Sequence, residues 1–153
     1  FVPMISKYIG TDISNNFIKQ NKLDFESNNA EFFHSPAHEF FYDDKFDYIF
    51  LIGLLTYMND EEIISMTSNC SKMLKKDGEL IIRNVVNKNS TRKFFDDKYF
   101  FIKHLFKSPR YQIIRRHEDE IASMISNDFK LLSTKKIEET SYKIYIWKLK
   151  NNE

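Results

Sequence analysis

The sequence predicts an α/β protein whose sheet is mostly parallel and ends in an antiparallel strand pair. Residues 46–52 form an apolar run on both faces, which is typical of a strand between two helix layers. An amphipathic helix pattern at residues 60–76 is followed at once by a strand pattern at residues 79–86, an order that favours parallel pairing. Two last strand patterns, at residues 131–138 and 142–149, are separated by only three residues, which is too short for anything but an antiparallel connection.

Local signals predict the elements of the first third of the chain. Residues 1–7 have the composition of the last turns of a helix, and residues 8–12 form a short strand pattern. A helix is expected at residues 13–25, because Ser14 is a good capping residue at its start. The predicted apolar face of that helix consists of Ile13, Phe17, Ile18 and Leu23. A second strand at residues 30–34 leads into a loop, since Pro36 restricts the residue before it to extended geometry.

The middle and last thirds follow the same logic. Gly53 lets the chain turn after the strand at residues 46–52, and Asn59 followed three residues later by Glu62 opens a helix as a capping box. Asp77 and Gly78 are expected to end that helix. Two further amphipathic helices are predicted at residues 90–107 and 118–127.

Composition restricts the class of protein. With 153 residues, 42% of them hydrophobic and 29% charged, the chain is expected to be one soluble domain, residues 1–153. A single cysteine, Cys70, excludes an internal disulfide and a cysteine-rich metal site, and it lies on an apolar helix face. No run is long enough to span a membrane, and the first residues do not resemble a signal peptide. We therefore expect a cytoplasmic protein with no metal site.

The charge is unevenly distributed although the net charge is only +1. Residues 88–116 contain nine Lys or Arg and two Asp, a balance of +7, so the remainder of the chain carries −6. Such a local field favours an anionic ligand. A solvated basic face is the alternative explanation of the same charges.

An acidic residue follows the first predicted strand. The stretch YIGTD ends in Asp12, and a capped helix begins directly behind it. In this arrangement a carboxylate can accept hydrogen bonds from both hydroxyl groups of a ribose. A helix-capping or solvated aspartate is an equally good interpretation of the position when it is taken alone.

Together, YIGTD, the stretch FDYIFLIGLLTYMND, the strand KKDGELIIR and the final antiparallel pair resemble the class I S-adenosylmethionine-dependent methyltransferases, which have a Rossmann-like sheet. The resemblance covers the chain from Tyr8 to Lys148 and rests on the order and spacing of four motifs. It implies S-adenosyl-L-methionine as the cofactor. Where the family usually has an acid for the adenine amino group, this chain has Pro36, and the backbone N–H of the next residue could still reach the ring. The resemblance assigns the cofactor to Asp12 (ribose), Ile13, Pro36 and Ala37 (adenine), and Ile52 and Gly53 (methionine part).

The resemblance also assigns the acceptor side. Thr56 and Tyr57 match positions that face donor and acceptor, and residues 87–117 match the variable segment that covers the acceptor as a lid. Arg83 and Asn84 are expected to bind the substrate as well, and they lead into this segment. Its expected substrate-binding residues are Arg110, Tyr111 and Arg115, and a catalytic base, if the acceptor is a hydroxyl, would be Tyr57, His104 or His117.

Aromatic and basic residues together suit a phosphorylated or carboxylated small molecule, such as a nucleotide-linked sugar. They also fit RNA. We rank RNA lower, because the positive charge is confined to one segment of an otherwise acidic chain.

Two other classes of protein would also fit these sequence patterns. A NAD-dependent oxidoreductase also has an acid after its second strand, although the antiparallel ending counts against it. A non-catalytic methyltransferase-like scaffold subunit would keep the fold without the chemistry.

The family's Gly-rich loop has no counterpart, because none of the three glycines, Gly10, Gly53 and Gly78, stands in that context. We therefore expect an N-terminally truncated domain that lacks the first strand, with roughly 30 to 50 further residues encoded upstream, by analogy with the strand-helix-strand unit. Such a truncated domain should be inactive alone and marginally stable, because backbone groups would be left unpaired in the sheet.

The basic segment gives a first prediction. Replacing Arg110 and Arg115 by Gln should raise the Michaelis constant of the acceptor, because two cationic contacts to an anionic group are lost, and should leave donor affinity nearly unchanged. Steady-state kinetics with varied acceptor, together with donor titration calorimetry, would measure both. A fall in donor affinity would show that the segment is wrongly assigned.

Overall fold

The computed structural model describes residues 5–25, 27, 29–85, 113–114, 116–137 and 142–150. The chain divides into two compact units, Phe1–Tyr42 and Asp43–Glu153, and each is considered by itself. The helix predicted at residues 90–107 lies outside the described residues, as does most of the segment 87–117. Residues 5–7 are not helical, which does not match the predicted helix end there.

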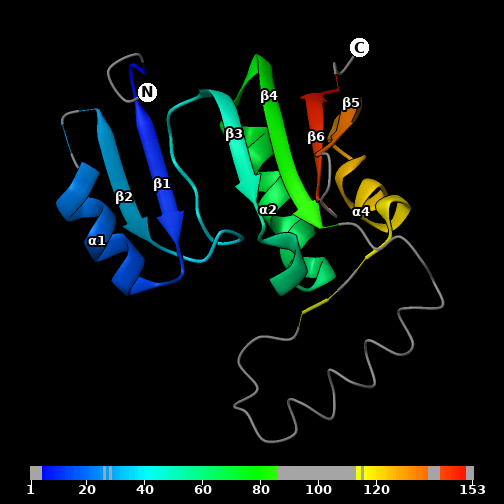
Figure 1. Cartoon of the computed structure of the whole chain (residues 1–153). Helices are drawn as coiled ribbons and strands as arrows, with labels where there is room; N and C mark the ends of the chain where they lie inside the picture. The colour runs from blue at the N-terminus through cyan, green and yellow to red at the C-terminus, as the bar shows by residue number, and fades with distance from the viewer. Residues whose placement is uncertain are drawn as a thin grey trace, which may run out of the picture. The chain divides into compact units, whose positions relative to one another are not determined.

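The first unit is a strand-helix-strand arrangement. β1 (Tyr8–Asp12) pairs in parallel with β2 (Ala30–His34), and α1 (Asn15–Phe25) connects them (Figure 1). Both strands have the predicted bounds. Of the predicted apolar helix face only Ile18 is buried, where it packs in a cluster with Ala30 and Phe32. Ile13, Phe17 and Leu23 are 56%, 66% and 82% exposed, so the prediction of one buried face is wrong for these positions. The described residues of this unit offer α1 two strands to pack on, β1 and β2, and these contact one side of the helix.

The second unit contains a four-stranded sheet with the order β3-β4-β6-β5. β3 (Phe46–Ile52) is parallel to β4 (Leu74–Val85), whereas β6 (Tyr142–Leu149) is antiparallel to both β4 and β5 (Phe129–Lys136). The predicted α/β fold class is confirmed: β1 pairs with β2 and β3 pairs with β4 in parallel, and the sheet of the second unit ends in the antiparallel pair β5 and β6.

Two helices form the layer on one face of the second unit's sheet (Figure 1). α2 (Asp60–Met73) begins behind the short 3-10 turn η2 (Leu55–Tyr57), and α4 (Glu118–Ile125) precedes β5. The two helices contact each other. They cover every second residue of the strands, because successive side chains of a strand point to opposite faces of the sheet. The buried residues of this layer are Leu51, Ile63, Met66, Cys70, Leu80, Ile82, Ile121, Ile125, Phe129, Tyr145 and Trp147.

The opposite face of β3 differs from the prediction. Leu51 is buried, but Tyr48, Phe50 and Ile52 are 57%, 60% and 49% exposed, so β3 is not enclosed on both faces by the described residues. Within the described residues β3 pairs with β4 alone and therefore forms an edge of its sheet. Its apolar residues are thus distributed over a buried face and an open one.

The end of α2 also differs from the prediction. The helix stops at Met73, and Leu74 is already extended, with φ −82° and ψ 145°. Asp77 and Gly78 lie inside β4 instead of ending the helix. A Cβ on Gly78 would lie 2.9 Å from the Phe46 carbonyl oxygen and 3.1 Å from that of Asp47. Gly78 is therefore required for the close approach of β3 to β4.

This close approach predicts the effect of a substitution. Gly78→Ala should lower the free energy of unfolding by about 1–3 kcal/mol, because two strand backbones would have to move apart. The nearby Lys76→Ala, at an exposed position of the same strand, should change it by less than about 0.5 kcal/mol. Urea denaturation would measure both. Equal stability of Gly78→Ala and wild type would contradict the proposed role of this glycine.

Cys70 gives a second prediction. It is a free, buried thiol, 3% exposed, and burial raises its pKa to about 12. The folded protein should therefore react with a thiol reagent at pH 8 only through unfolding, because the thiolate is the nucleophile. The reaction should become fast in about 6 M guanidinium chloride, because a protein whose unfolding midpoint lies below about 5 M is unfolded at that concentration. Rapid modification under native conditions would show that Cys70 is accessible.

Candidate active site

Hydrogen bonds join the carboxyl ends of β1 and β2 in the first unit. The carbonyl oxygen of Asp12 accepts from the Ser35 N–H at 3.2 Å, and the Thr11 hydroxyl donates to the Ser35 carbonyl at 2.9 Å. His34 Nε2 lies 2.9 Å from the Ile13 carbonyl oxygen. The residues after the two strands are therefore held next to each other, as ligand binding at a strand end requires.

The Asp12 carboxylate makes a hydrogen bond within its own segment and is also exposed to solvent. Its Oδ1 accepts from the Ser14 N–H at 2.7 Å, while the Ser14 hydroxyl accepts weakly from Phe17 N at 3.4 Å near the start of α1. Asp12 is exposed, and each carboxylate oxygen can accept two hydrogen bonds. Asp12 therefore stabilises the turn just before α1 while Ser14 caps the helix, and acceptor capacity of the Asp12 carboxylate remains for a ligand hydroxyl.

The loop after β2 completes this end of the first unit. The Pro36 carbonyl oxygen accepts from the N–H groups of Glu39 and Phe40, both at 3.1 Å, which closes a tight turn. None of the described residues accepts the N–H of Ala37. Ile13 presents an apolar side chain that is 56% exposed. The predicted cofactor residues of this unit therefore follow two adjacent strand ends and include an exposed acid, an exposed apolar surface and an available N–H donor.

In the second unit, the chain turns sharply behind β3. Gly53 has φ +71°, a conformation that favours glycine, and its N–H donates to the Arg83 carbonyl at 2.9 Å. The Thr56 hydroxyl is near the Gly53 carbonyl oxygen at 3.4 Å, and Thr56 is only 9% exposed. Tyr57 is 54% exposed. Of the two predicted donor- and acceptor-facing residues, Tyr57 projects outward and Thr56 packs inside the turn.

Arg83 and Asn84 do not share a face. Arg83 stands opposite Ile52 in the sheet, and its guanidinium lies 4.5 Å from the ring centroid of Tyr142, a cation–π contact. Asn84 points to the helix-covered face, where it is 2% exposed and where the described residues give its Oδ1 no hydrogen-bond partner. The strand alternation thus places the two residues, both predicted to bind the substrate, on opposite faces of the sheet.

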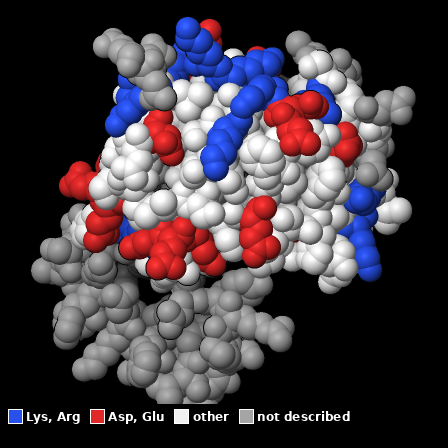
Figure 2. All heavy atoms as spheres, turned by 180° about the vertical axis from the view of Figure 1, so that it is seen from behind, with Lys and Arg blue, Asp and Glu red and all other residues white. Residues whose placement is uncertain are grey.

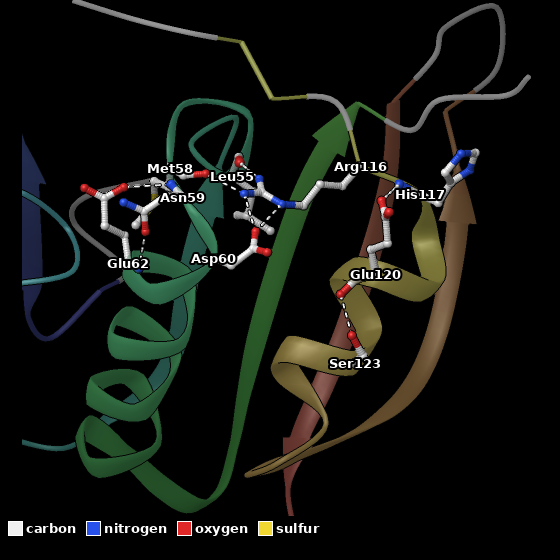
Figure 3. Close-up of polar contacts among 9 residues, drawn as sticks. All are labelled: Leu55, Met58, Asn59, Asp60, Glu62, Arg116, His117, Glu120 and Ser123. Atoms are coloured by element: carbon white, nitrogen blue, oxygen red, sulfur yellow. Dashed lines mark hydrogen bonds and ion pairs between the residues drawn. The ribbon is translucent and has the colours of Figure 1, made fainter. Parts of the chain in front are cut away.

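Arg116 is part of this end of the sheet, and sequence reasoning did not single it out. It is 6% exposed and reaches from just before α4 to the turn behind β3 (Figure 3). Its Nε and one terminal nitrogen donate to Asp60 Oδ1 at 2.9 and 2.6 Å, and its terminal nitrogens donate to the carbonyls of Leu55 and Met58, both at 2.7 Å. In the sequence Arg116 is one of nine basic residues in its segment, and no local signal distinguishes it.

The remaining candidates for acceptor binding and catalysis divide into two groups. His117 is described: its backbone N–H donates to the Glu120 carboxylate at 2.6 Å at the start of α4, and its ring points away from the turn behind β3 (Figure 3). His104, Arg110, Tyr111 and Arg115 lie outside the described residues. Within the described ranges there is no group of three residues suited to a metal, and no helix is long and apolar enough to cross a membrane.

Acidic residues gather at the starts of both helices of the second unit. The first turn of α2 contains Asp60, Glu61 and Glu62, and the first turn of α4 contains Glu118, Asp119 and Glu120. Figure 2 shows acidic side chains along the lower part of the face seen from behind. They suit the positive ends of the helix dipoles. The described part of this sheet end is therefore acidic, whereas the basic segment predicted to favour an anionic ligand is almost entirely outside the described residues.

Solved structures share this fold. The PH0226 protein from Pyrococcus horikoshii OT3 superposes with a TM-score of 0.70 at 18% identity, over 94% of this chain and 72% of that one. The N-methyltransferase NodS from Bradyrhizobium japonicum WM9, in complex with S-adenosyl-L-homocysteine, gives 0.69 at 11% identity, over 96% and 68%. An S-adenosylmethionine-dependent methyltransferase from Clostridium acetobutylicum ATCC 824 gives 0.72 at 12% identity, over 97% and 77%. At these identities the likeness concerns the fold.

A family profile supplies the sequence relationship. No curated protein matches the chain. The profile described as "Methyltransferase domain" matches residues 3–80, from before β1 to the middle of β4, which is just over half of the chain. The chain therefore belongs to the methyltransferase domain family.

Proposed function

We propose that this chain forms the S-adenosyl-L-methionine site of a methyltransferase that acts on a small-molecule acceptor. The observation that carries the proposal is Asp12, an exposed carboxylate at the end of β1 that is tied to the loop behind β2 and keeps acceptor capacity. Family membership supports methyl transfer as the chemistry. NodS, a protein of the same fold, was crystallised with S-adenosyl-L-homocysteine, the product form of this donor.

The residues of the first unit fit the nucleoside part of the donor. Asp12 would accept hydrogen bonds from the ribose hydroxyls, since carboxylate oxygens are strong acceptors for such groups. Ile13 offers an apolar surface for the adenine ring, and the Ala37 N–H is available to a ring nitrogen. Pro36 provides no side-chain acceptor for the adenine amino group, so recognition of adenine would depend on backbone and apolar contacts.

The residues of the second unit fit the reacting end. The left-handed conformation of Gly53 turns the chain directly after the exposed Ile52, where the methionine part of the donor would bind. When bound, the donor supplies an electrophilic methyl group on a sulfonium: the acceptor forms a bond to this carbon as the carbon–sulfur bond breaks. Alignment and exclusion of water supply much of the rate enhancement for such a displacement. Thr56 and Tyr57 are the residues of the turn that would order acceptor and donor.

For the acceptor, we favour an anionic small molecule such as a nucleotide-linked sugar. Residues 88–116 carry a charge of +7, which would attract such a ligand. A nucleic acid is a weaker candidate, because acidic residues open both helices at the described end of the sheet. We also place the protein in the cytoplasm, where the buried free thiol of Cys70 would remain reduced.

Asp12 gives the test of the proposed function. In the full-length protein, Asp12→Ala should weaken S-adenosylmethionine binding tenfold or more, which corresponds to the loss of about 1.5–3 kcal/mol from hydrogen bonds to a charged group. Isothermal titration calorimetry would measure this change. Asp12→Asn keeps an oxygen for the Ser14 N–H but removes the charge, so it should retain the start of α1 and still bind the donor more weakly.

The matched control is Asp24→Ala, which removes an exposed carboxylate of α1 that accepts a hydrogen bond from the Gln20 side-chain amide at 2.8 Å. It should bind the donor as the wild type does. Unchanged donor affinity in Asp12→Ala would refute the assignment of Asp12. Binding of a nicotinamide nucleotide by the wild type would favour an oxidoreductase, and binding of neither ligand would favour the non-catalytic scaffold.

A further inference from the structure

The turn behind β3 is held from three directions by hydrogen bonds. Gly53 is fixed to Arg83 at the end of β4, and the Thr56 carbonyl oxygen accepts from the Ile114 N–H at 2.7 Å. Arg116 binds the carbonyls of Leu55 and Met58 on either side of Thr56 (Figure 3). The turn is thus contacted both by the end of β4 and by the residues that return to α4.

Arg116 donates hydrogen bonds to two backbone carbonyls of the turn, those of Leu55 and Met58. η2 is only three residues long, so its own ladder is limited to the bond from Tyr57 N to the Leu54 carbonyl at 2.8 Å. Met58 is extended, and the carbonyls at the end of such a short helix need partners from elsewhere. Arg116 supplies them with a planar guanidinium, whose fixed fork can bind several acceptors at once.

The ion pair between Arg116 and Asp60 is not expected to add much to the stability of the fold. The side chain of Arg116 is 7% exposed, whereas that of its partner Asp60 is 70% exposed. Burying the cation is costly, and replacing a buried ion pair by apolar residues is often neutral or stabilising. What an apolar residue could not supply is the set of directed bonds to Leu55, Met58 and Asp60. The geometry of Arg116 therefore favours a role in fixing the conformation of the turn.

We propose that Arg116 is a positioning residue for methyl transfer: by holding the Leu55 and Met58 carbonyls it fixes Thr56 and Tyr57 at the donor-facing end of β3. The inference rests on the proposed function, which places the reacting end of the donor beside this turn. Arg116 touches neither donor nor acceptor in this role and acts through the backbone of the turn. Asp60 aligns the guanidinium and also lies in the first turn of α2.

The test uses conservative variants of the full-length protein. Arg116→Lys keeps the positive charge but offers a single ammonium, which cannot bind three separated acceptors. It should fold, as judged by circular dichroism, and the amides of residues 54–58 should exchange with deuterium about tenfold faster. Affinity for S-adenosyl-L-homocysteine, measured by calorimetry well below the unfolding temperature, should fall about tenfold. Asp60→Asn leaves an acceptor oxygen and both carbonyl bonds, so its effect should be smaller.

The matched control is Cys70→Ala, which removes a buried group from α2 and lowers stability without touching the turn. It should bind S-adenosyl-L-homocysteine as the wild type does and leave exchange of residues 54–58 unchanged. Wild-type affinity in Arg116→Lys would overturn the positioning role. Equal losses of affinity in Arg116→Lys and Cys70→Ala would overturn it as well, because general destabilisation would then explain both. A wild type that binds no S-adenosyl-L-homocysteine would overturn the proposed function and, with it, this inference.

Discussion

The parallel pairing of β3 with β4 is the constraint on which the second unit depends. Its register places Leu51 opposite Ile82 on the helix-covered face and Ile52 opposite Arg83 on the other. The same register brings Gly53 to the carbonyl of Arg83, so the chain leaves β3 at a defined point. A slip of one residue would move each side chain of β3 to the wrong face and would separate Gly53 from its partner. The position of the turn is therefore a consequence of strand pairing.

Local patterns were sufficient to predict most of the strands and helices. The bounds of β1, β2 and β3 agree with the apolar runs, and the capping box of Asn59 and Glu62 is formed by hydrogen bonds of 2.9 and 2.7 Å. These features depend on residues close in sequence, which is why they could be read directly. The end of α2 could not, because Asp77 and Gly78 suit both a helix end and a close strand crossing. Only the position of the β3 backbone decides between them.

Burial and long-range contacts were the features that the sequence left undetermined. An apolar run such as Tyr48 to Ile52 shows that a strand is hydrophobic on both sides, but not how much of each side is covered within the described residues. Arg116 bonds to residues 56 to 61 positions earlier in the chain, and neither its type nor its neighbours indicate such a partner. Asp12 lies between these cases: its place at the end of β1 was predictable, whereas its hydrogen bond with the Ser14 N–H was not.

The long sequence distance between Arg116 and its partners has a consequence for the order in which the protein folds. β3, η2 and α2 are close in sequence and can form early, but the bonds of Arg116 to Leu55 and Met58 close loops of 61 and 58 residues. Loop closure of this length carries an entropic cost that local contacts do not, and contacts of high sequence separation slow folding. During synthesis, the turn remains without its arginine until the chain beyond β4 has left the ribosome, since elongation proceeds from the N-terminus. The turn behind β3 is therefore among the last parts of this unit to acquire its final shape.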